Sequence, residues 1–279
     1  MRQLSTTAPF GFEFDPAEFL ATYRALGCRW AEFYRNTDNP PATAHALRIA
    51  DAAGVRFDSV HGVFGHDIDP SSPDKAHRDH CLRIYEREAR LALDLGAPVV
   101  IVHPSANYKD LRPIPAPEAD RAQAARWDHF DDFAKRLAVI GERLSVTYLF
   151  ENVPRNFPLG HDPAELARRT LAISSKRLRL CFDVGHANIT ADLPTALRDC
   201  APAIAYIHIH DNHGVEDQHL MPGDGSINWT AFAKSLYETR LSVPCMLEVF
   251  YDLHHVTRLA EQGLAAQLRT ACSLNGSAA

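Results

Sequence analysis

The segment "PVVIVHP" at residues 98–104 decides the fold, because it is the clearest strand in the chain. Its apolar residues are consecutive rather than alternating, and a strand that is apolar on both faces is typical of a parallel sheet covered by helices. The segment lies between a helical stretch at 73–96 and a second one at 118–144. Such an order of helix, buried strand and helix is typical of an α/β fold.

The same alternation of short strands and longer helices continues in both directions from 98–104. We expect strands at 2–10, 28–34, 56–64, 98–104, 146–153, 178–184, 203–210 and 245–250. We expect helices at 15–27, 41–54, 73–96, 118–144, 162–173, 193–202, 228–241 and 255–274. These units predict a single (β/α)8 TIM barrel domain over residues 1–279, with a flexible tail at 272–279. A doubly wound open sheet is the alternative, but no glycine-rich phosphate loop follows the first strand.

The composition restricts the classes of function. The chain has 279 residues, of which 46% are hydrophobic and 23% charged, as is ordinary for a globular enzyme. The net charge of -6 argues against a protein that holds nucleic acid through its overall charge. No stretch approaches the roughly 18 apolar residues of a membrane span. The six cysteines include no CxxC pair, which predicts reduced thiols and a cytoplasmic protein.

Imidazole and carboxyl side chains stand at the carboxyl ends of the expected strands. They are His61, His103, Glu151, Asp183, His208 and Glu248, followed by His186 after the sixth strand and by Asp217 and His219 after the seventh. In a (β/α)8 barrel these strand ends meet at one rim, where the active sites of this fold lie. Glu151 and Glu248 each follow an apolar run, so their buried carboxylates require a cation or a proton. The sequence therefore predicts a metal site at this rim.

The types of ligand indicate which ions would bind. Imidazole and carboxylate without thiolate suit zinc, manganese, cobalt or ferrous iron. The nine candidates exceed what one ion needs, and a carboxylate that bridges two ions would use them all. We expect one to three divalent ions per chain, with zinc preferred and manganese or cobalt as alternatives.

Several motifs together resemble the xylose isomerase-like TIM barrels. They are "VIVHPS" (100–105), "FENVP" (150–154), "CFDVGHA" (181–187), "IHIHDN" (207–212), "PGDGSINW" (222–229) and "LEVF" (247–250). This superfamily includes sugar and sugar-phosphate isomerases and epimerases as well as zinc-dependent AP endonucleases. Resemblance to the epimerase branch implies one divalent ion held by Glu151, Asp183, His208 and Glu248. The two glutamates would also move protons on either face of the substrate carbon, and His186 would contact the substrate.

The full set of nine residues also resembles the trinuclear zinc site of the AP endonucleases. That resemblance implies one ion on His61, His103 and Glu151, a second on Glu151, Asp183, His208 and Glu248, and a third on His186, Asp217 and His219. Glu151 would bridge the first two ions. No concentrated wedge of arginine and tyrosine for opening a duplex follows His61, although Arg35 and Phe64 are weak substitutes.

The leading hypothesis is a metal-dependent isomerase or epimerase of a sugar, sugar phosphate or related polyol. Glu151 and Glu248 would act as base and acid at a carbon next to a metal-bound carbonyl. No lysine follows Glu151 in "ENVPR" (151–155), which disfavours an aldose–ketose hydride shift. Arg155 is a candidate anchor for a substrate phosphate or carboxylate, although a solvated loop arginine is the simpler interpretation.

Two other classes of function are weighed against this one. The runner-up is a trinuclear-zinc phosphodiesterase resembling AP endonuclease, and only this function would make nucleic acid a partner. The third is a non-catalytic metal-binding barrel, which the size of the ligand set disfavours. Residues 210–213 are expected to orient neighbouring imidazoles, with His210 turned outward relative to His208. The exact substrate, the number of ions and the oligomeric state are left open.

Overall fold

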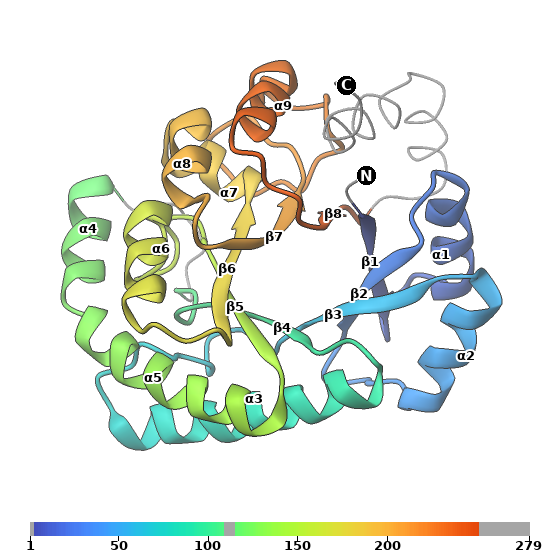
Figure 1. Cartoon of the computed structure of the whole chain (residues 1–279), viewed down its shortest axis with the longest axis horizontal. Helices are drawn as coiled ribbons and strands as arrows, with labels where there is room; N and C mark the ends of the chain where they lie inside the picture. Colours follow the sequence, from blue (N-terminus) through green and yellow to red (C-terminus); the bar gives the residue numbers. More distant parts are fainter. Residues whose placement is uncertain (1–2, 109–114, 251–279) are drawn as a thin grey trace.

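A computed structural model describes residues 3–108 and 115–250, which form a closed barrel of parallel strands (Figure 1). The strands are β1 (Leu4–Phe10), β2 (Trp30–Arg35), β3 (Arg56–His61), β4 (Val99–Val102), β5 (Thr147–Glu151), β6 (Leu178–Asp183), β7 (Ile204–Ile209) and β8 (Cys245–Leu247). Neighbours in sequence are neighbours in space, and β1 pairs in parallel with both β2 and β8, which closes the ring. The predicted (β/α)8 architecture is confirmed.

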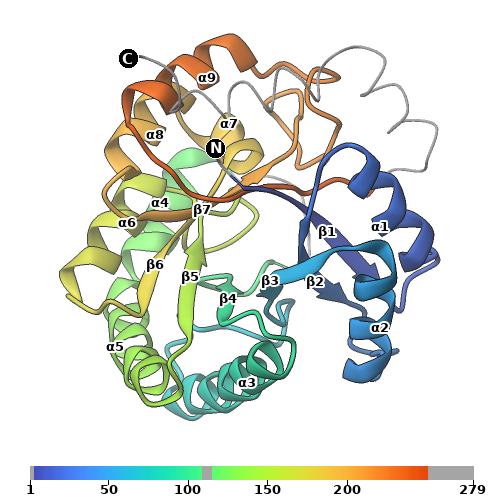
Figure 2. The ribbon, with the colours of Figure 1, turned by 45° about the vertical axis from the view of Figure 1, so that its right-hand side comes forward.

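Helices cover the outside of this ring, as the two views of the ribbon show (Figures 1 and 2). They are α1 (Pro16–Ala25), α2 (Thr43–Ala53), α3 (Lys75–Asp94), α4 (Ala116–Ala124), α5 (Trp127–Leu144), α6 (Pro163–Ala172), α7 (Val184–Thr190), α8 (Leu193–Cys200) and α9 (Trp229–Glu238). Asp15, Asp74 and Asp162 each accept a hydrogen bond from a backbone N–H of the first turn of a helix, as preferred N-cap residues do. The predicted helix at 255–274 and the predicted tail at 272–279 lie outside the described residues, and the extent of the domain over 1–279 stays a prediction.

Two elements differ from the expectation. The single helix expected at 118–144 is two helices, which are separated by a turn at 125–126 in which Arg126 has φ -109°. Trp127 then begins α5 as a buried residue. The short helix α7 was not expected. It forms because the carboxylate of Asp183 at the end of β6 accepts the backbone N–H of His186 at 2.6 Å and so caps the first turn.

The interior of the barrel is filled by side chains and is not a pore. Ile101, Leu149, Cys181, Tyr206 and Met246 come from successive strands, β4 to β8, and pack against one another inside the ring. The larger core lies between the strands and the surrounding helices. The inner cluster supports the layer above it, at the carboxyl ends of the strands, where the polar residues gather.

Two expectations from composition can be compared with the structure. In the part of the chain that is described, none of the helices has the length and apolar character that crossing a bilayer would require. Cys81, Cys181 and Cys200 are buried thiols outside any disulfide, in agreement with the prediction of reduced cysteines.

Candidate metal centre

Six of the predicted ligands come from the carboxyl ends of six strands. His61, Glu151 and Asp183 are the last residues of β3, β5 and β6, His208 lies within β7, and His103 and Glu248 directly follow β4 and β8. Each of the six is at most 7% exposed. The register of the sheet places Asp183 beside His208, so that neighbouring strands direct these side chains into the same space. The strand ends therefore meet at one rim, as the sequence predicts.

The first group of side chains surrounds one oxygen of Glu151. Oε2 of Glu151 lies 3.5 Å from Nε2 of His61 and 3.1 Å from Nε2 of His103. Ligand atoms of these three residues lie within 4.8 Å of one another. Nδ1 of His61 lies 3.1 Å from the carbonyl oxygen of Gly62, and because a carbonyl only accepts, Nδ1 is the donor. The Nε2 lone pair of His61 is therefore directed at the group.

The second group surrounds Nδ1 of His208. This nitrogen lies 3.0 Å from Oε1 of Glu151, 2.9 Å from Oε2 of Glu248 and 3.8 Å from Oδ2 of Asp183. Ligand atoms of all four residues lie within 4.8 Å of one another. Glu151 thus belongs to both groups, with Oε2 facing the first and Oε1 facing the second. A carboxylate in this position can bridge two cations.

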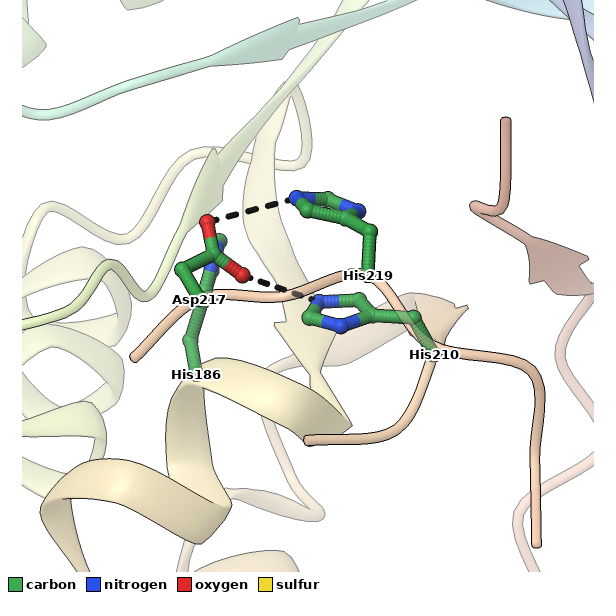
Figure 3. Close-up of side chains that lie close together, drawn as sticks. All are labelled: His186, His210, Asp217 and His219. Carbon is green, nitrogen blue, oxygen red and sulfur yellow. Dashed lines mark hydrogen bonds and ion pairs between the residues drawn. The ribbon is translucent and has the colours of Figure 1, made fainter. Parts of the chain in front are cut away.

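The third group brings together His186, His210, Asp217 and His219 (Figure 3). Oδ2 of Asp217 lies 3.1 Å from Nε2 of His186 and 3.2 Å from Nε2 of His219. Nδ1 of His186 donates to the carbonyl oxygen of Asn152 at 2.8 Å, and Nδ1 of His219 donates to that of Glu248 at 3.0 Å. As in His61, a backbone carbonyl holds the proton on Nδ1 and leaves Nε2 for the group.

The prediction that His210 turns outward was wrong. Its side chain is fully buried, and Nε2 lies 3.1 Å from Oδ1 of Asp183 and 3.8 Å from Oδ1 of Asp217. Side chains two residues apart on a strand share a face, so the alternation itself places His210 with His208. Gly185 makes room for the ring, since a Cβ there would lie 2.0 Å from Cε1 of His210.

Asp211 folds the loop that carries Asp217 and His219. Its carboxylate accepts hydrogen bonds from the backbone N–H of Gly223 at 2.8 Å and from the indole Nε1–H of Trp229 at 2.8 Å. Its backbone also forms an antiparallel bridge with that of Leu220. Asp211 was expected to orient imidazoles, and its hydrogen bonds instead hold the loop that presents them.

The backbone of this loop is strained at one ligand. His219 adopts φ 45°, in the left-handed region that residues with a Cβ rarely occupy. Such a conformation costs on the order of 1 kcal/mol and persists where the surroundings fix it. Here the hydrogen bond to the carbonyl of Glu248 and the contact with Asp217 fix the imidazole.

The buried carboxylates and imidazoles shift one another's pKa values. Burial alone would raise the pKa of Glu151 and Glu248, but the neighbouring imidazoles, above all His208, lower both well below the ordinary range. Burial alone would lower the pKa of His186, yet Asp183 and Asp217 raise it well above its usual value. The pKa of His219 behaves in the same way. Burial alone would lower it, but the carboxylate of Asp217 raises it to about 10.

The donor set fits divalent cations. The buried oxygens Oε2 of Glu151 and Oε2 of Glu248 accept no hydrogen bond from the described residues. Carboxylate oxygens without donors, together with imidazole lone pairs directed at the same points, are the ligands that zinc and manganese take. Burying these carboxylates without a compensating positive charge would be costly. The three groups contain all nine residues that the sequence singled out, with His210 in addition.

Glu32 on β2 was missed by the sequence reasoning. Its side chain is buried, with Oε2 accepting a hydrogen bond from Oγ of Ser59 at 2.8 Å and lying 3.4 Å from Nε2 of His208. Ligand atoms of Glu32, His61 and Glu248 also lie within 4.8 Å of one another. A signal was present in "WAEFY" (30–34), where one carboxylate stands among apolar and aromatic residues.

A pocket of about 170 Å³ opens beside His61, and its walls include Phe12, Tyr34, Asn36 and Phe64. The ring of Phe64 lies 5.0 Å from that of His61 and is 39% exposed, so this side chain borders the entrance. Arg35 also lines the pocket, but its Nη2 lies 2.6 Å from Oε1 of the buried Glu88. The guanidinium of Arg35, the weak substitute for a wedge that opens a duplex, is therefore engaged in an ion pair with Glu88.

Arg155 has a structural partner that neither sequence interpretation named. Its guanidinium donates to the carbonyl oxygens of Ile189 at 2.9 Å and Thr190 at 2.8 Å, at the end of α7. A cation at this end of a helix satisfies carbonyl groups that lack partners within the helix. Arg155 therefore holds α7, and with it His186, instead of standing in solvent as a free anchor.

Comparisons with known proteins bear on the fold and on the family of the chain. An uncharacterized protein of Methanocaldococcus jannaschii is 30% identical over 205 residues, which cover 72% of this chain and 66% of that protein, just under two thirds of its length. A solved structure of a D-tagatose 3-epimerase-like protein has a TM-score of 0.72 at 21% identity, over 97% of this chain and 99% of that one. A solved L-ribulose 3-epimerase has a TM-score of 0.73 at 20% identity, over 100% of both chains.

These structural likenesses, at such low identity, concern the fold. The sequence match to a family is more extensive, because residues 20–270 match the family described as "Xylose isomerase-like TIM barrel". The matched range begins within α1 and passes beyond β8, so that it includes every strand that supplies a candidate ligand. The chain therefore belongs to the xylose isomerase-like TIM barrel family.

Proposed function

We propose that the chain is a metal-dependent isomerase or epimerase of a sugar, sugar phosphate or related polyol, which works by proton transfer at a carbon next to a carbonyl. The observation that carries this proposal is the pair of carboxylates on Nδ1 of His208. Glu151 approaches it from β5 at 3.0 Å, and Glu248 approaches it from β8 at 2.9 Å. Two carboxylates that flank one metal site can remove a proton and return one from different sides.

In this proposal Glu151, Asp183, His208 and Glu248 hold the divalent ion. When bound, the ion polarises the carbonyl and the adjacent hydroxyl of the substrate and makes the intervening C–H more acidic. The lowered pKa values keep Glu151 and Glu248 ionised at neutral pH, which the group that takes up the proton requires. The other glutamate takes up a proton from water and returns it to the opposite face of the carbon, and the proton on the first glutamate passes to water.

The aromatic pocket beside His61 would hold the remainder of the substrate. The rings of Tyr34, Phe12 and Phe64 offer apolar faces, and Asn36 offers hydrogen-bonding groups. Such a combination suits a carbohydrate, which has apolar C–H faces and polar edges. The names of the similar solved structures, a D-tagatose 3-epimerase-like protein and an L-ribulose 3-epimerase, support a ketose as the substrate.

The test begins with metal analysis of the purified chain and continues with proton exchange. The metal-loaded protein is incubated in D2O with D-tagatose, L-ribulose and their phosphates, and deuterium at the carbon next to the carbonyl is followed by NMR. We expect exchange in the wild type and its loss in E151Q and E248Q. The exposed variant E142Q is the matched control and should exchange normally. A chain that binds no divalent ion, or that exchanges no proton in any of these sugars, overturns the proposal.

A second candidate function is hydrolysis of a phosphodiester at a cluster of three zinc ions. The third group, His186, His210, Asp217 and His219, favours it, because a single-ion epimerase site does not need these residues. The position of Glu151 between the first two groups favours it as well. Incubation with a DNA duplex that contains one abasic site separates the two functions. Incision that is lost in D217N would support the hydrolase and would count against the epimerase.

A further inference from the structure

A line of polar side chains runs through the inside of the barrel beneath the candidate metal centre. Asp58 accepts a hydrogen bond from the hydroxyl of Tyr206 at 2.9 Å, and its Oδ1 lies 3.2 Å from Oγ of Ser59. Oγ of Ser59 also lies 2.8 Å from Oε2 of Glu32, which in turn lies 3.4 Å from Nε2 of His208. The line therefore ends at one of the candidate ligands.

Glu32 is the member of this line whose presence demands an explanation. The interior of a (β/α)8 barrel is normally filled by branched apolar side chains. The other side of the same interior follows that rule, with Ile101, Leu149 and Met246 packed together. A carboxylate that is 1% exposed in such a layer is unfavourable unless it serves a partner.

The orientation of His208 identifies that partner. In His61, His186 and His219, Nδ1 donates to a backbone carbonyl and Nε2 faces the carboxylates. His208 is reversed, since its Nδ1 faces Glu151 and Glu248. Its buried Nε2 makes no hydrogen bond of good geometry within residues 3–108 and 115–250. Oε2 of Glu32 lies 3.4 Å from this nitrogen and is the negative group that faces it.

We propose that Glu32 is a positioning residue that keeps the proton of His208 on Nε2 and thereby leaves Nδ1 for the divalent ion. A carboxylate on the far nitrogen of a metal-binding imidazole fixes its tautomer and its orientation and makes it a stronger ligand. The hydrogen bond from Ser59 fixes the carboxylate itself. This inference rests on the proposed metal-dependent function and adds to it a residue that need not touch the substrate.

The thiol of Cys181 also lies beside His208 inside the barrel. A neutral thiol is a weak acceptor and cannot provide the charge that a carboxylate provides. Glu32 is therefore the better partner for the proton on Nε2.

The experiment compares E32Q and E32A with D58N as the matched control. Asp58 belongs to the same interior line, but the described contacts link it to His208 only through other side chains. Zinc affinity is measured by competition with a chromophoric chelator, zinc stoichiometry by elemental analysis, and the imidazole tautomers of the zinc-loaded full chain by ¹⁵N NMR. We expect E32A to weaken zinc binding at one site about 10–100-fold without changing the stoichiometry.

E32Q should lose less zinc affinity than E32A, because the amide oxygen can still accept a hydrogen bond from Nε2 of His208. The glutamine also has the shape of the glutamate, so E32Q remains a valid test if E32A fails to fold. D58N should stay within about twofold of the wild type, since the expected effect acts through contact with the imidazole. Among the zinc-bound imidazoles of the wild type, the ¹⁵N spectrum should show one that carries its proton on Nε2 and binds through Nδ1, and E32A should alter that signal.

Three results would overturn the inference. Unchanged zinc affinity and unchanged tautomers in both Glu32 variants would remove the positioning role. Loss of one whole zinc equivalent in E32Q would make Glu32 a ligand, together with His61 and Glu248, and not a residue that acts through His208. A wild-type chain that binds no divalent ion would overturn the proposed function together with this inference, whereas the first two results overturn the inference alone.

Discussion

Nδ1 of His219 donates a hydrogen bond of 3.0 Å to the backbone carbonyl of Glu248. Glu248 therefore serves two groups at once, because its carboxylate lies 2.9 Å from Nδ1 of His208 in the second group. The loop after β7 is fastened in this way to the residue that follows β8. The second group therefore helps to position the third, and a substitution of Glu248 should disturb the side chains of both groups.

Binding of the ions should release protons at neutral pH. The pKa of His219 is raised to about 10 by Asp217 against the effect of burial, and those of His186 and His208 are raised well above the usual value. The raised pKa values favour the protonated imidazoles when no metal is bound, and an ion must displace protons to reach a lone pair. We expect on the order of two to three protons per chain on full loading. Calorimetric titration in buffers of different ionisation enthalpy measures this number, and an enthalpy that is independent of the buffer would contradict it.

The stability of the metal-free protein should be greatest in mildly acidic solution. His219 has a pKa of about 10 in the folded chain against an ordinary value of 6.5, so its contribution to stability is complete below about pH 6.5 and is lost as the pH rises through 10. Glu151 and Glu248 have lowered pKa values, so their contribution is present above the usual 4.5 and is lost as the pH falls. Urea unfolding in the presence of a chelator, from pH 4 to pH 10, should give a maximum near pH 5–6.5. In H219Q the decline on the alkaline side should be smaller.

Removal of metal should lower the melting temperature. An ion present at 100 times its Kd stabilises the folded chain by about 2.7 kcal/mol per site. For a domain of this size one kcal/mol corresponds to about 2–4 °C, so each emptied site should cost roughly 5–10 °C. Differential scanning calorimetry with and without a chelator measures the shift. Re-addition of zinc should restore the melting temperature, and a chelator that leaves it unchanged would speak against bound ions.

The substitution G185A should disturb the third group. Alanine normally favours a helix over glycine by about 1 kcal/mol. At this position, however, a Cβ would lie 2.0 Å from the ring of His210. We expect the free energy of unfolding to fall by about 1–3 kcal/mol and the zinc stoichiometry to fall with it. In an H210A background the same substitution should be neutral or stabilising, and an equal loss in both backgrounds would refute the steric explanation.

The substitution D211N should loosen the loop that carries Asp217 and His219. One carboxylate oxygen of Asp211 accepts from the N–H of Gly223 and the indole of Trp229, and the other accepts from the N–H groups of Asn212 and Ile227. An amide has only one oxygen, so its NH2 group would face one of these two pairs of donors. We expect a loss of about 2–4 kcal/mol in unfolding free energy, because hydrogen bonds to a charged acceptor are replaced by unpaired donors. A change in Trp229 fluorescence emission reports the opening of the loop. The exposed E216Q in the same loop is the control and should behave as the wild type.

The strand pattern was sufficient to predict where the ligands meet. Buried strands and helices alternate along the chain, and in a parallel barrel the residue at the end of each strand has only one rim to occupy. His103 and Glu151 could be assigned on this basis because each directly ends an apolar run. Glu32 could not, because it lies one layer below the rim, and the period of a strand gives the side of the sheet but not the depth inside the barrel.

Local context explains the remaining differences. The helix α7 has seven residues, too few to show an amphipathic period, and it depends on the cap from Asp183 and on the contacts of Arg155. The position of His210 depends on the missing side chain of Gly185, which lies on a different element. Neither relationship can be derived from the spacing of residues along one segment.

The candidate ligands are distributed over most of the described chain, from His61 at the end of β3 to Glu248 just after β8. During synthesis the first group, His61, His103 and Glu151, leaves the ribosome long before Glu248 does. The second group becomes complete only when β8 pairs with β7. Metal held at the second group would therefore report that the last described strand has joined the sheet, so that cobalt absorbance could follow this late step of folding.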